Sequence, residues 1–176
     1  MYRFRVSLIR YFPDPSEFAR IMLQTGTIIG GSTALSIIAG GSWRPGDLDL
    51  IVTRRYLPRL VDYLVQQGYR FNQDVSRERK GQYVLDAEDE PLYSQFRLDI
   101  HMSFVMNFVS GEGAYSFVPD ETFSGRGYRN RYTVTKQLDR ILLKYEARGY
   151  EEVIDEKYGD SQHESGRFKV QSFKNI

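Results

Sequence analysis

The chain has 176 residues, which is the length of one ordinary domain. Lys and Arg number 24 against 23 Asp and Glu, so a net charge of +1 gives no strong general signature of nucleic-acid binding, and the absence of cysteine excludes disulfides, thiolate nucleophiles and cysteine-ligated zinc. Because no apolar run approaches the ~18 residues of a membrane span and residues 1–10 lack the long apolar stretch of a signal peptide, we expect a cytoplasmic protein with no membrane partner.

The first third of the chain alternates between helix and strand signals. Asp14 is a suitable helix cap, Pro15 suits a first helical position, and Gly26 follows the last residue of the apolar periodicity. In chain order we expect a helix over 15–24, a short buried strand over 27–29, a helix over 33–38, a strand over 47–52 and a helix over 56–67. The last of these helices ends at Gly68, and its inward face is expected to consist of Leu57, Leu60, Val61 and Leu64.

The rest of the chain predicts a hairpin and one long helix. The expected elements are a strand beginning at 69–71, hairpin strands over 82–85 and 96–102, a short helix over 104–109, mostly loop over 111–131, a helix over 134–148, and a short helix with a loose tail over 151–176. These elements predict the α/β (α+β) class: a single domain over 1–176, with a mixed β-sheet flanked by α-helices and a core over about 12–150.

Two acidic residues, Asp47 and Asp49, stand one residue apart on an expected strand. Side chains at positions i and i+2 of a strand point to the same face, so the two carboxylates project together. Such a pair is unfavourable unless a cation lies between its members, and hard Mg²⁺ prefers oxygen ligands. The alternative is a pair of surface acids at a strand entrance, after the turn at Arg44-Pro45-Gly46.

A glycine turn, Gly30-Gly31-Ser32, lies between an expected strand and an expected helix. Backbone N–H groups at a helix N-terminus bind phosphate readily where no Cβ atom obstructs them, and Ser32 adds a hydroxyl. The alternative is an ordinary turn in which Ser32 caps the helix.

A third acid, Asp99, lies in the expected strand 96–102, on the same face as Arg97 and His101. If this strand neighbours the strand of Asp47 and Asp49, three carboxylates converge on one place. The alternative for Asp99 is a salt bridge to a nearby arginine. His101 is a candidate metal ligand on the same face, and the favoured alternative for it is a hydrogen-bonded strand histidine.

These residues resemble a known family. A Gly-Ser turn that opens a helix, an Asp-x-Asp pair and a later lone Asp are similar to the nucleotidyltransferase superfamily related to DNA polymerase beta, and in particular to its members found in large numbers in mushroom-forming fungi. The resemblance covers residues from about 27 to 150, and its segments are Ile29-Gly30-Gly31-Ser32-Thr33-Ala34-Leu35, Trp43-Arg44-Pro45-Gly46-Asp47-Leu48-Asp49, Val105-Met106-Asn107-Phe108, Lys144-Tyr145 and Arg148-Gly149.

The resemblance implies a role for each matching position. Gly30, Gly31 and Ser32 would hold the phosphates of a nucleoside triphosphate (NTP). Asp47, Asp49 and Asp99 would be the catalytic acids and would bind two Mg²⁺ or Mn²⁺ ions, one that lowers the pKa of the attacking hydroxyl and one that stabilises the leaving pyrophosphate.

Basic residues of the 134–148 helix are the other candidates for phosphate contact. Lys144 and Arg148 lie near the boundary of its apolar stripe and are expected to bind the nucleotide, whereas Lys136 and Arg140 point away from that stripe and are expected to be solvated. Trp43 is expected to anchor a loop, and flanking the nucleotide is its alternative role.

Three functions remain open at this point. The first is a metal-dependent nucleotidyltransferase, which moves a nucleoside monophosphate from an NTP to a hydroxyl of a protein, an RNA end or a small molecule. The second is a non-catalytic module that binds a nucleotide or a protein on the same fold, and the third is a structural protein. The three acids favour the first, because clustered carboxylates without a cation would be costly.

Overall fold

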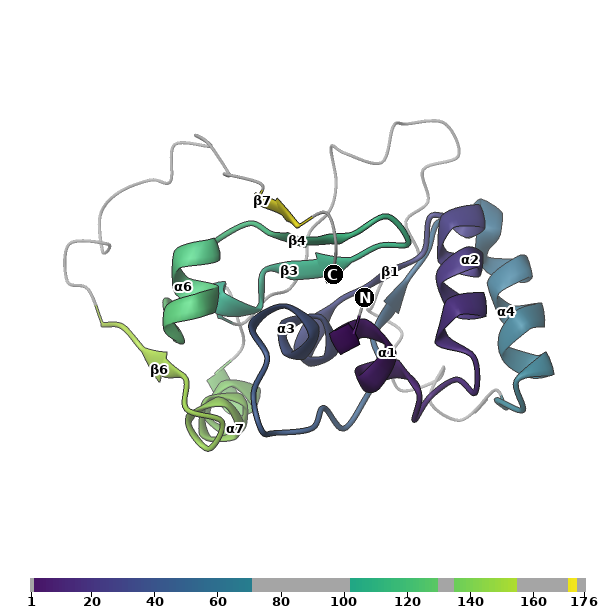
Figure 1. Ribbon diagram of the computed structural model, residues 1–176. Helices are drawn as coiled ribbons and strands as arrows, with labels where there is room; N and C mark the ends of the chain where they lie inside the picture. Colours follow the sequence, from purple (N-terminus) through teal and green to yellow (C-terminus); the bar gives the residue numbers. More distant parts are fainter. Residues whose placement is uncertain (1, 71–101, 130–134, 155–170, 174–176) are drawn as a thin grey trace.

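The computed structural model describes residues 2–70, 102–129, 135–154 and 171–173 (Figure 1). The helices are α1 (Tyr2–Leu8), α2 (Pro15–Thr25), α3 (Gly31–Ala39), α4 (Leu57–Gln66), α6 (Pro119–Ser124) and α7 (Thr135–Glu146), with 3₁₀ turns η1 (Arg54–Tyr56) and η2 (Ser103–Val105). The strands are β1 (Ile28–Ile29), β2 (Leu50–Ile51), β3 (Asn107–Val109), β4 (Ala114–Ser116), β5 (Arg126–Gly127), β6 (Glu151–Glu152) and β7 (Gln171–Phe173).

Five short strands form one sheet in the order β2-β1-β3-β4-β7. Every pairing in it is antiparallel, and β1 joins the two halves because Ile29 lies opposite both Leu50 and Val109. The parallel pair β5–β6 is separate. The class is therefore mixed α/β, as expected, but within the described residues the expected mixed sheet is an antiparallel sheet.

Helix α3 is the centre of the molecule and is buried along most of its length. It packs against β3 and η2, and α1 packs against it from the front (Figure 1). Its side chains enter two apolar clusters. One lies among α1, α2, α4 and the sheet and includes Phe12, Phe18 and Ile37, and the other joins Leu35 to η2 and α7.

Several helices begin and end where the sequence predicts. The Asp14 carboxylate accepts hydrogen bonds from the N–H groups of Ser16 and Glu17, and Gly26 ends α2 in the left-handed region. Helices α3, α4 and α7 likewise match the expected helices to within a few residues at each end. In α4 the expected inward face is partly wrong, because Leu57 is exposed whereas Tyr63 is buried beside Leu60.

Other local expectations are wrong. The apolar run 104–109 is η2 followed by strand β3 rather than a helix, and 111–131 contains β4, α6 and β5 rather than mostly loop. A short apolar run fits a buried strand as well as a helix, and here pairing with β1 and β4 makes residues 107–109 a strand. The segment that begins at Glu151 opens with strand β6 rather than a helix, and β7 joins its later part to the sheet.

The beginning of the chain also corrects an expectation. Helix α1 precedes the expected core boundary at about residue 12, and it buries Phe4 and Leu8. The strand expected over 47–52 is shorter, since β2 begins at Leu50, and Asp47 and Asp49 therefore lie in the loop before it. Tyr69 lies outside any strand. The hairpin strands expected over 82–85 and 96–102 lie outside the described residues except for Met102, which forms an isolated antiparallel bridge with Arg129. No described helix has the length and apolar character needed to cross a membrane.

Candidate functional site

The N-terminus of α3 is built on two consecutive glycines. Gly30 is the N-cap residue with an extended backbone, and Gly31 begins the helix with φ of +60°, a conformation that residues with a Cβ atom rarely adopt. Ser32 follows and is buried. The sequence predicted a helix start at this turn, and the structure confirms it, with Gly30 rather than Ser32 as the cap.

Asp49 lies directly against this glycine turn. A Cβ atom placed on Gly31 would be 2.1 Å from the Asp49 Oδ2 atom, so the carboxylate keeps this position only while the residue has no side chain. The backbone N–H of Gly30 donates to the Asp49 carbonyl oxygen at 3.0 Å, which ties the loop to the helix. Because this N–H is engaged, it is not available as a phosphate donor, contrary to the role expected for Gly30.

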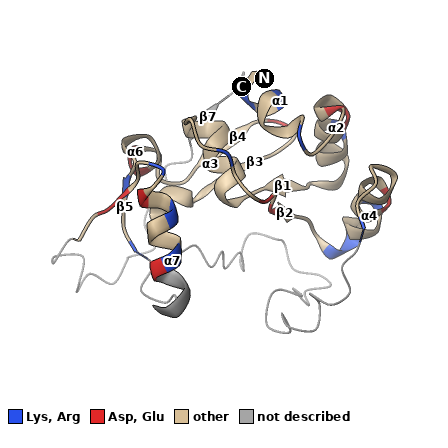
Figure 2. Ribbon diagram, turned by 90° about the horizontal axis from the view of Figure 1, so that it is seen from below, with Lys and Arg blue, Asp and Glu red and all other residues tan. Residues whose placement is uncertain are grey.

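Asp47 is held at the same helix end by two hydroxyl groups. The Ser32 Oγ donates to the Asp47 Oδ1 atom at 3.3 Å, and the Thr33 Oγ1 donates to the Asp47 carbonyl oxygen at 2.7 Å. Both aspartates are exposed to solvent. Figure 2 shows the red of this acidic segment beside β2.

The result is a group of oxygen atoms at the positive end of a helix. Two carboxylates and the Ser32 hydroxyl come together there, and the dipole of α3 favours negative charge at this place. Carboxylate and hydroxyl oxygens are the donors that hard divalent cations prefer. In the described part of the chain no third His, Asp or Glu joins the pair, and Asp99 and His101 lie outside that part.

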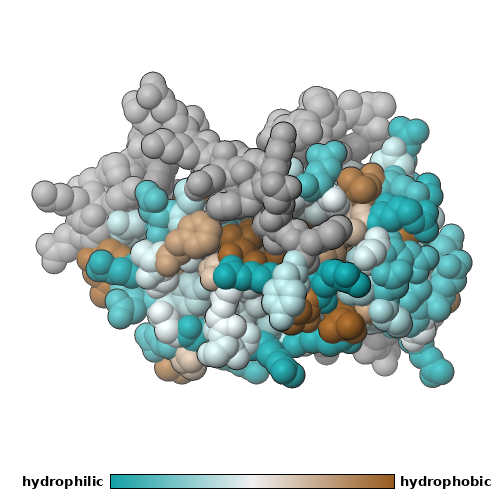
Figure 3. Space-filling view, in the orientation of Figure 1, coloured by the Kyte–Doolittle hydropathy of each residue, from teal (hydrophilic) through white to brown (hydrophobic). Residues whose placement is uncertain are grey.

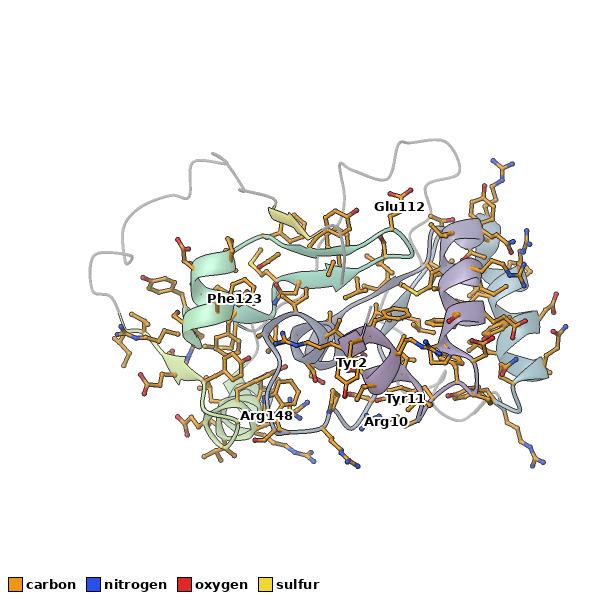
Figure 4. All side chains as sticks on the ribbon, viewed as in Figure 1. Tyr2, Arg10, Tyr11, Glu112, Phe123 and Arg148 are labelled. Atoms are coloured by element: carbon orange, nitrogen blue, oxygen red, sulfur yellow. The ribbon has the colours of Figure 1, made fainter. Side chains whose placement is uncertain are left out.

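Helix α1 and the turn after it hold the acidic loop from the other side. The Tyr11 hydroxyl donates to the Asp47 carbonyl oxygen at 2.9 Å, and the Arg10 guanidinium donates to the Pro45 carbonyl oxygen. Figure 4 shows Arg10 and Tyr11 close together on one face of the molecule. Sequence reasoning missed both residues, since nothing local indicates that residues 10 and 11 reach the loop before β2.

The turn that follows α7 packs next to the acidic loop through Arg148. The Arg148 guanidinium lies 4.2 Å from the centre of the Trp43 ring and 5.3 Å from that of Tyr145. Its Nη1 atom is buried and has no hydrogen-bond partner in the described part of the chain. Gly41 closes on Trp43, since a Cβ atom there would be 2.7 Å from the indole Nε1. Trp43 is thus packed between Gly41 and Arg148, as expected of a loop anchor.

Tyr145 lies beneath Arg148 and is 7% exposed. Burial is the main cause that raises the pKa of its hydroxyl to about 12; Arg148 lowers this pKa, while the carboxylates of Asp47 and Asp49 raise it. The hydroxyl therefore stays protonated at neutral pH and is close enough to both acids to sense their charge. The sequence placed Tyr145 on the apolar face of its helix and in the Lys144-Tyr145 segment of the family resemblance, and indicated no role for it at the site.

The two expected phosphate contacts, Lys144 on α7 and Arg148 in the turn after it, differ in their surroundings. Arg148 is half-buried beside Trp43 and the acidic loop, whereas Lys144 is exposed, with its Nζ atom 5.6 Å from the centre of the Tyr145 ring. Arg140 is exposed, and the side chain of Lys136 lies outside the described residues. The structure thus brings Gly31, Ser32, Asp47 and Asp49 together, with Arg148 nearby.

The fold and the site define a mixed α/β protein in which the central helix begins with glycine and a pair of aspartates from the loop before β2 lies at its N-terminus. Comparisons of the chain with protein-family models, with curated proteins and with solved structures give no significant match. The chemistry of the site is therefore the basis on which a function is proposed.

Proposed function

We propose that this chain is a metal-dependent nucleotidyltransferase, which acts in the cytoplasm without a membrane partner and moves a nucleoside monophosphate from an NTP to a hydroxyl acceptor. The observation that carries the proposal is the contact between the Asp49 carboxylate and Gly31. This contact joins an acidic pair to the backbone N–H groups of a helix N-terminus, so ligands for a cation and donors for phosphate oxygens lie side by side.

The proposal gives each residue a role. Asp47 and Asp49, together with Asp99 from outside the described residues, would hold Mg²⁺ or Mn²⁺, and the oxygen donors of the two described acids fit such an ion. A bound ion supplies positive charge to the phosphate oxygens and lowers the pKa of an attacking hydroxyl. The N–H groups of Gly31 and Ser32 would orient the terminal phosphates.

Arg148 would supply a positively charged side chain in addition to the metal ion. Its buried Nη1 atom lacks a hydrogen-bond partner in the described residues, and a buried guanidinium nitrogen gains most from an anionic oxygen. Packing between Trp43 and Tyr145 fixes the plane of the guanidinium, which reduces the entropy lost when a phosphate binds. Lys144, which is exposed, would add a screened and weaker attraction.

The alternative is a non-catalytic module that binds a nucleotide or a protein on the same fold. The hydrogen bond from the Ser32 hydroxyl to the Asp47 carboxylate favours it, because this bond and the dipole of α3 stabilise an acid at this place without a metal.

Calorimetry and a pyrophosphate assay separate these functions. Titration of the full chain with each NTP in Mg²⁺ or Mn²⁺ tests binding, and release of pyrophosphate in the presence of a cell extract tests transfer. Asp49→Asn should weaken metal-dependent NTP binding sharply, because a neutral amide is a poor ligand for Mg²⁺. Asp62→Asn is the matched control, since Asp62 is an exposed acid on α4.

Each outcome has a definite meaning. Metal-dependent binding with pyrophosphate release, both lost in Asp49→Asn and kept in Asp62→Asn, supports the enzyme. Binding without pyrophosphate release supports the non-catalytic module. An absence of metal-dependent binding for every NTP contradicts both nucleotide functions.

A further inference from the structure

The outward face of α1 is an apolar stripe that the fold does not use. Tyr2, Val6 and Ile9 are 81%, 55% and 64% exposed. Their spacing of four and three residues places them on one face of the helix, which continues to Ile9 through a hydrogen bond from its N–H to the Arg5 carbonyl oxygen. The opposite face carries Phe4 and Leu8 into the core, so exposure of the stripe is not a sign of a loose helix.

Arginines flank this stripe on both sides. Arg5 lies on one side of it, and Arg3 and Arg10 lie on the other, by the helical positions of these residues. None of the three forms an ion pair with an acid of the described residues, and the first acid in the sequence is Asp14. Figure 3 shows brown apolar surface among teal hydrophilic surface where α1 crosses the viewed face.

Two of these arginines are fixed in place. Arg3 donates to the Ile38 carbonyl oxygen at 2.9 Å, and its guanidinium packs against Gly40. Arg10 donates to the Pro45 carbonyl oxygen. Both keep further N–H groups, because a guanidinium has five, so they present ordered positive charge along one edge of the stripe.

The same face adjoins the acidic loop. Figure 4 shows Tyr2, Arg10 and Tyr11 together, and the Tyr11 hydroxyl contacts the backbone of Asp47. A chain that lies along α1 is therefore brought next to the segment that carries Asp47 and Asp49.

We propose that the outward face of α1 docks a protein segment that combines apolar and acidic side chains. Apolar side chains of the segment cover Tyr2, Val6 and Ile9, and its carboxylates pair with the flanking arginines, which bind carboxylates with two parallel hydrogen bonds. Resting on the proposed function, we further infer that this protein is the hydroxyl acceptor, since docking places it beside the acidic loop.

An anionic membrane is the other surface that could suit such a helix, and the geometry favours the protein. Helices that lie in a membrane interface present a broad apolar face. In α1, Phe4 and Leu8 are buried in the core, and only a narrow apolar stripe is exposed. Arg3 and Arg10 are held by backbone carbonyl oxygens along the edge of the stripe, where they meet carboxylates of a docked segment.

Binding of synthetic peptides to the full chain tests the docking without nucleotide or metal. The probe is a fluorescent peptide with leucines at helical spacing and glutamates at the flanking positions, compared with two peptides in which glutamine or lysine replaces glutamate. We expect the glutamate peptide to bind best and to weaken in higher salt, because salt screens exposed charges. Vesicles of phosphatidylcholine, with and without phosphatidylserine, are tested in parallel.

Variants assign the binding to α1. Serine at all three stripe positions (Tyr2→Ser, Val6→Ser and Ile9→Ser together) should lower the affinity for the glutamate peptide about tenfold or more. Arg5→Gln should lower this affinity less and should reduce the salt dependence of binding. This variant keeps the inference testable if the triple variant fails to fold. Val65→Ser, on an exposed apolar residue of α4, is the matched control and should bind as the wild type does.

The results also separate this inference from the proposed function. Equal binding of the three peptides, unchanged binding by the α1 variants, or stronger binding to phosphatidylserine vesicles than to the peptide overturns the docking, whatever the outcome with NTP. If docking and transfer both occur, a carrier protein with the glutamate segment should be modified faster than the same carrier with the lysine segment. Equal rates contradict the assignment of the acceptor.

Discussion

The Tyr11 hydroxyl donates a hydrogen bond of 2.9 Å to the carbonyl oxygen of Asp47, thirty-six residues away in the sequence. Tyr11 is itself held by the hydroxyl of Tyr69, which donates to the Tyr11 carbonyl oxygen at 2.7 Å. The position of Asp47 therefore depends on the N-terminal segment and on the residues after α4, as well as on the helix that it faces.

Tyr11→Phe tests this dependence because it removes one hydroxyl and keeps the ring. We expect Mg²⁺-dependent NTP binding to weaken about fivefold, which corresponds to the about 1 kcal/mol of a typical net hydrogen bond. The expected weakening of NTP binding is limited, because the Thr33 hydroxyl also donates to the Asp47 carbonyl oxygen. Calorimetry measures it, with Tyr2→Phe as the control on an exposed tyrosine; equal losses in both variants would contradict the role of Tyr11.

Gly31→Ala should lower the stability of the protein and displace Asp49. A Cβ atom at φ of +60° costs about 1–2 kcal/mol, and here it also meets the Asp49 carboxylate, so we expect a loss of about 2 kcal/mol and a fall in Tm of about 4–8 °C. Gly46→Ala is the control, because a Cβ atom there meets nothing within 4 Å. Thermal melts of both variants check the prediction, which fails if they melt alike.

Arg148 should matter for more than its charge. Arg148→Ala removes the contacts with Trp43 and Tyr145, and we expect a loss of about 1 kcal/mol of stability together with weaker NTP binding. Arg148→Lys keeps the charge but not the planar contact, so it should recover NTP binding only in part. Arg140→Ala, on an exposed arginine of α7, is the control in melts and calorimetry. Full recovery by lysine would reduce the role of Arg148 to charge.

The stability of the protein should fall between about pH 10 and 12. Burial raises the pKa of Tyr145 from 10.0 to about 12, so the unfolded chain ionises first as the pH rises. The stabilisation is therefore complete below pH 10 and is lost through this interval, up to about 3 kcal/mol for two pH units. Tyr145→Phe should make this part of the profile less steep, as measured by urea unfolding at each pH, and Tyr63, whose pKa burial also raises to about 12, keeps part of the slope. Tyr2→Phe should leave the profile steep.

Tyr63→Phe should leave the stability unchanged or raise it. The Tyr63 hydroxyl is buried between α2 and α4 and has no hydrogen-bond partner in the described residues. Its ring packs 5.9 Å from those of Phe12 and Phe18, and phenylalanine keeps these contacts. Because an unpaired buried hydroxyl costs about 1–3 kcal/mol, its removal offsets any loss. A fall in Tm of the variant would indicate a partner for this hydroxyl.

The sequence by itself determined the elements whose signals are local. Helix α2 carries its own start and stop in Asp14, Pro15 and Gly26, and each acts on the backbone within one turn. The glycine turn before α3 was recognisable for the same reason, since consecutive glycines predict a backbone that other residues avoid. The spacing of Asp47 and Asp49 indicated a shared site, although they precede β2 rather than lie on it.

Only the tertiary structure decided the elements and contacts that depend on distant partners. Helix α1 is stabilised by the burial of Phe4 and Leu8, and strand β3 by pairing with β1 and β4, so neither has a decisive local signal. The meeting of Asp49 with Gly31 depends in the same way on atoms far apart in the chain. Local patterns determine backbone conformation over a few residues, whereas the position of a site depends on how buried surfaces and hydrogen bonds bring separate segments together.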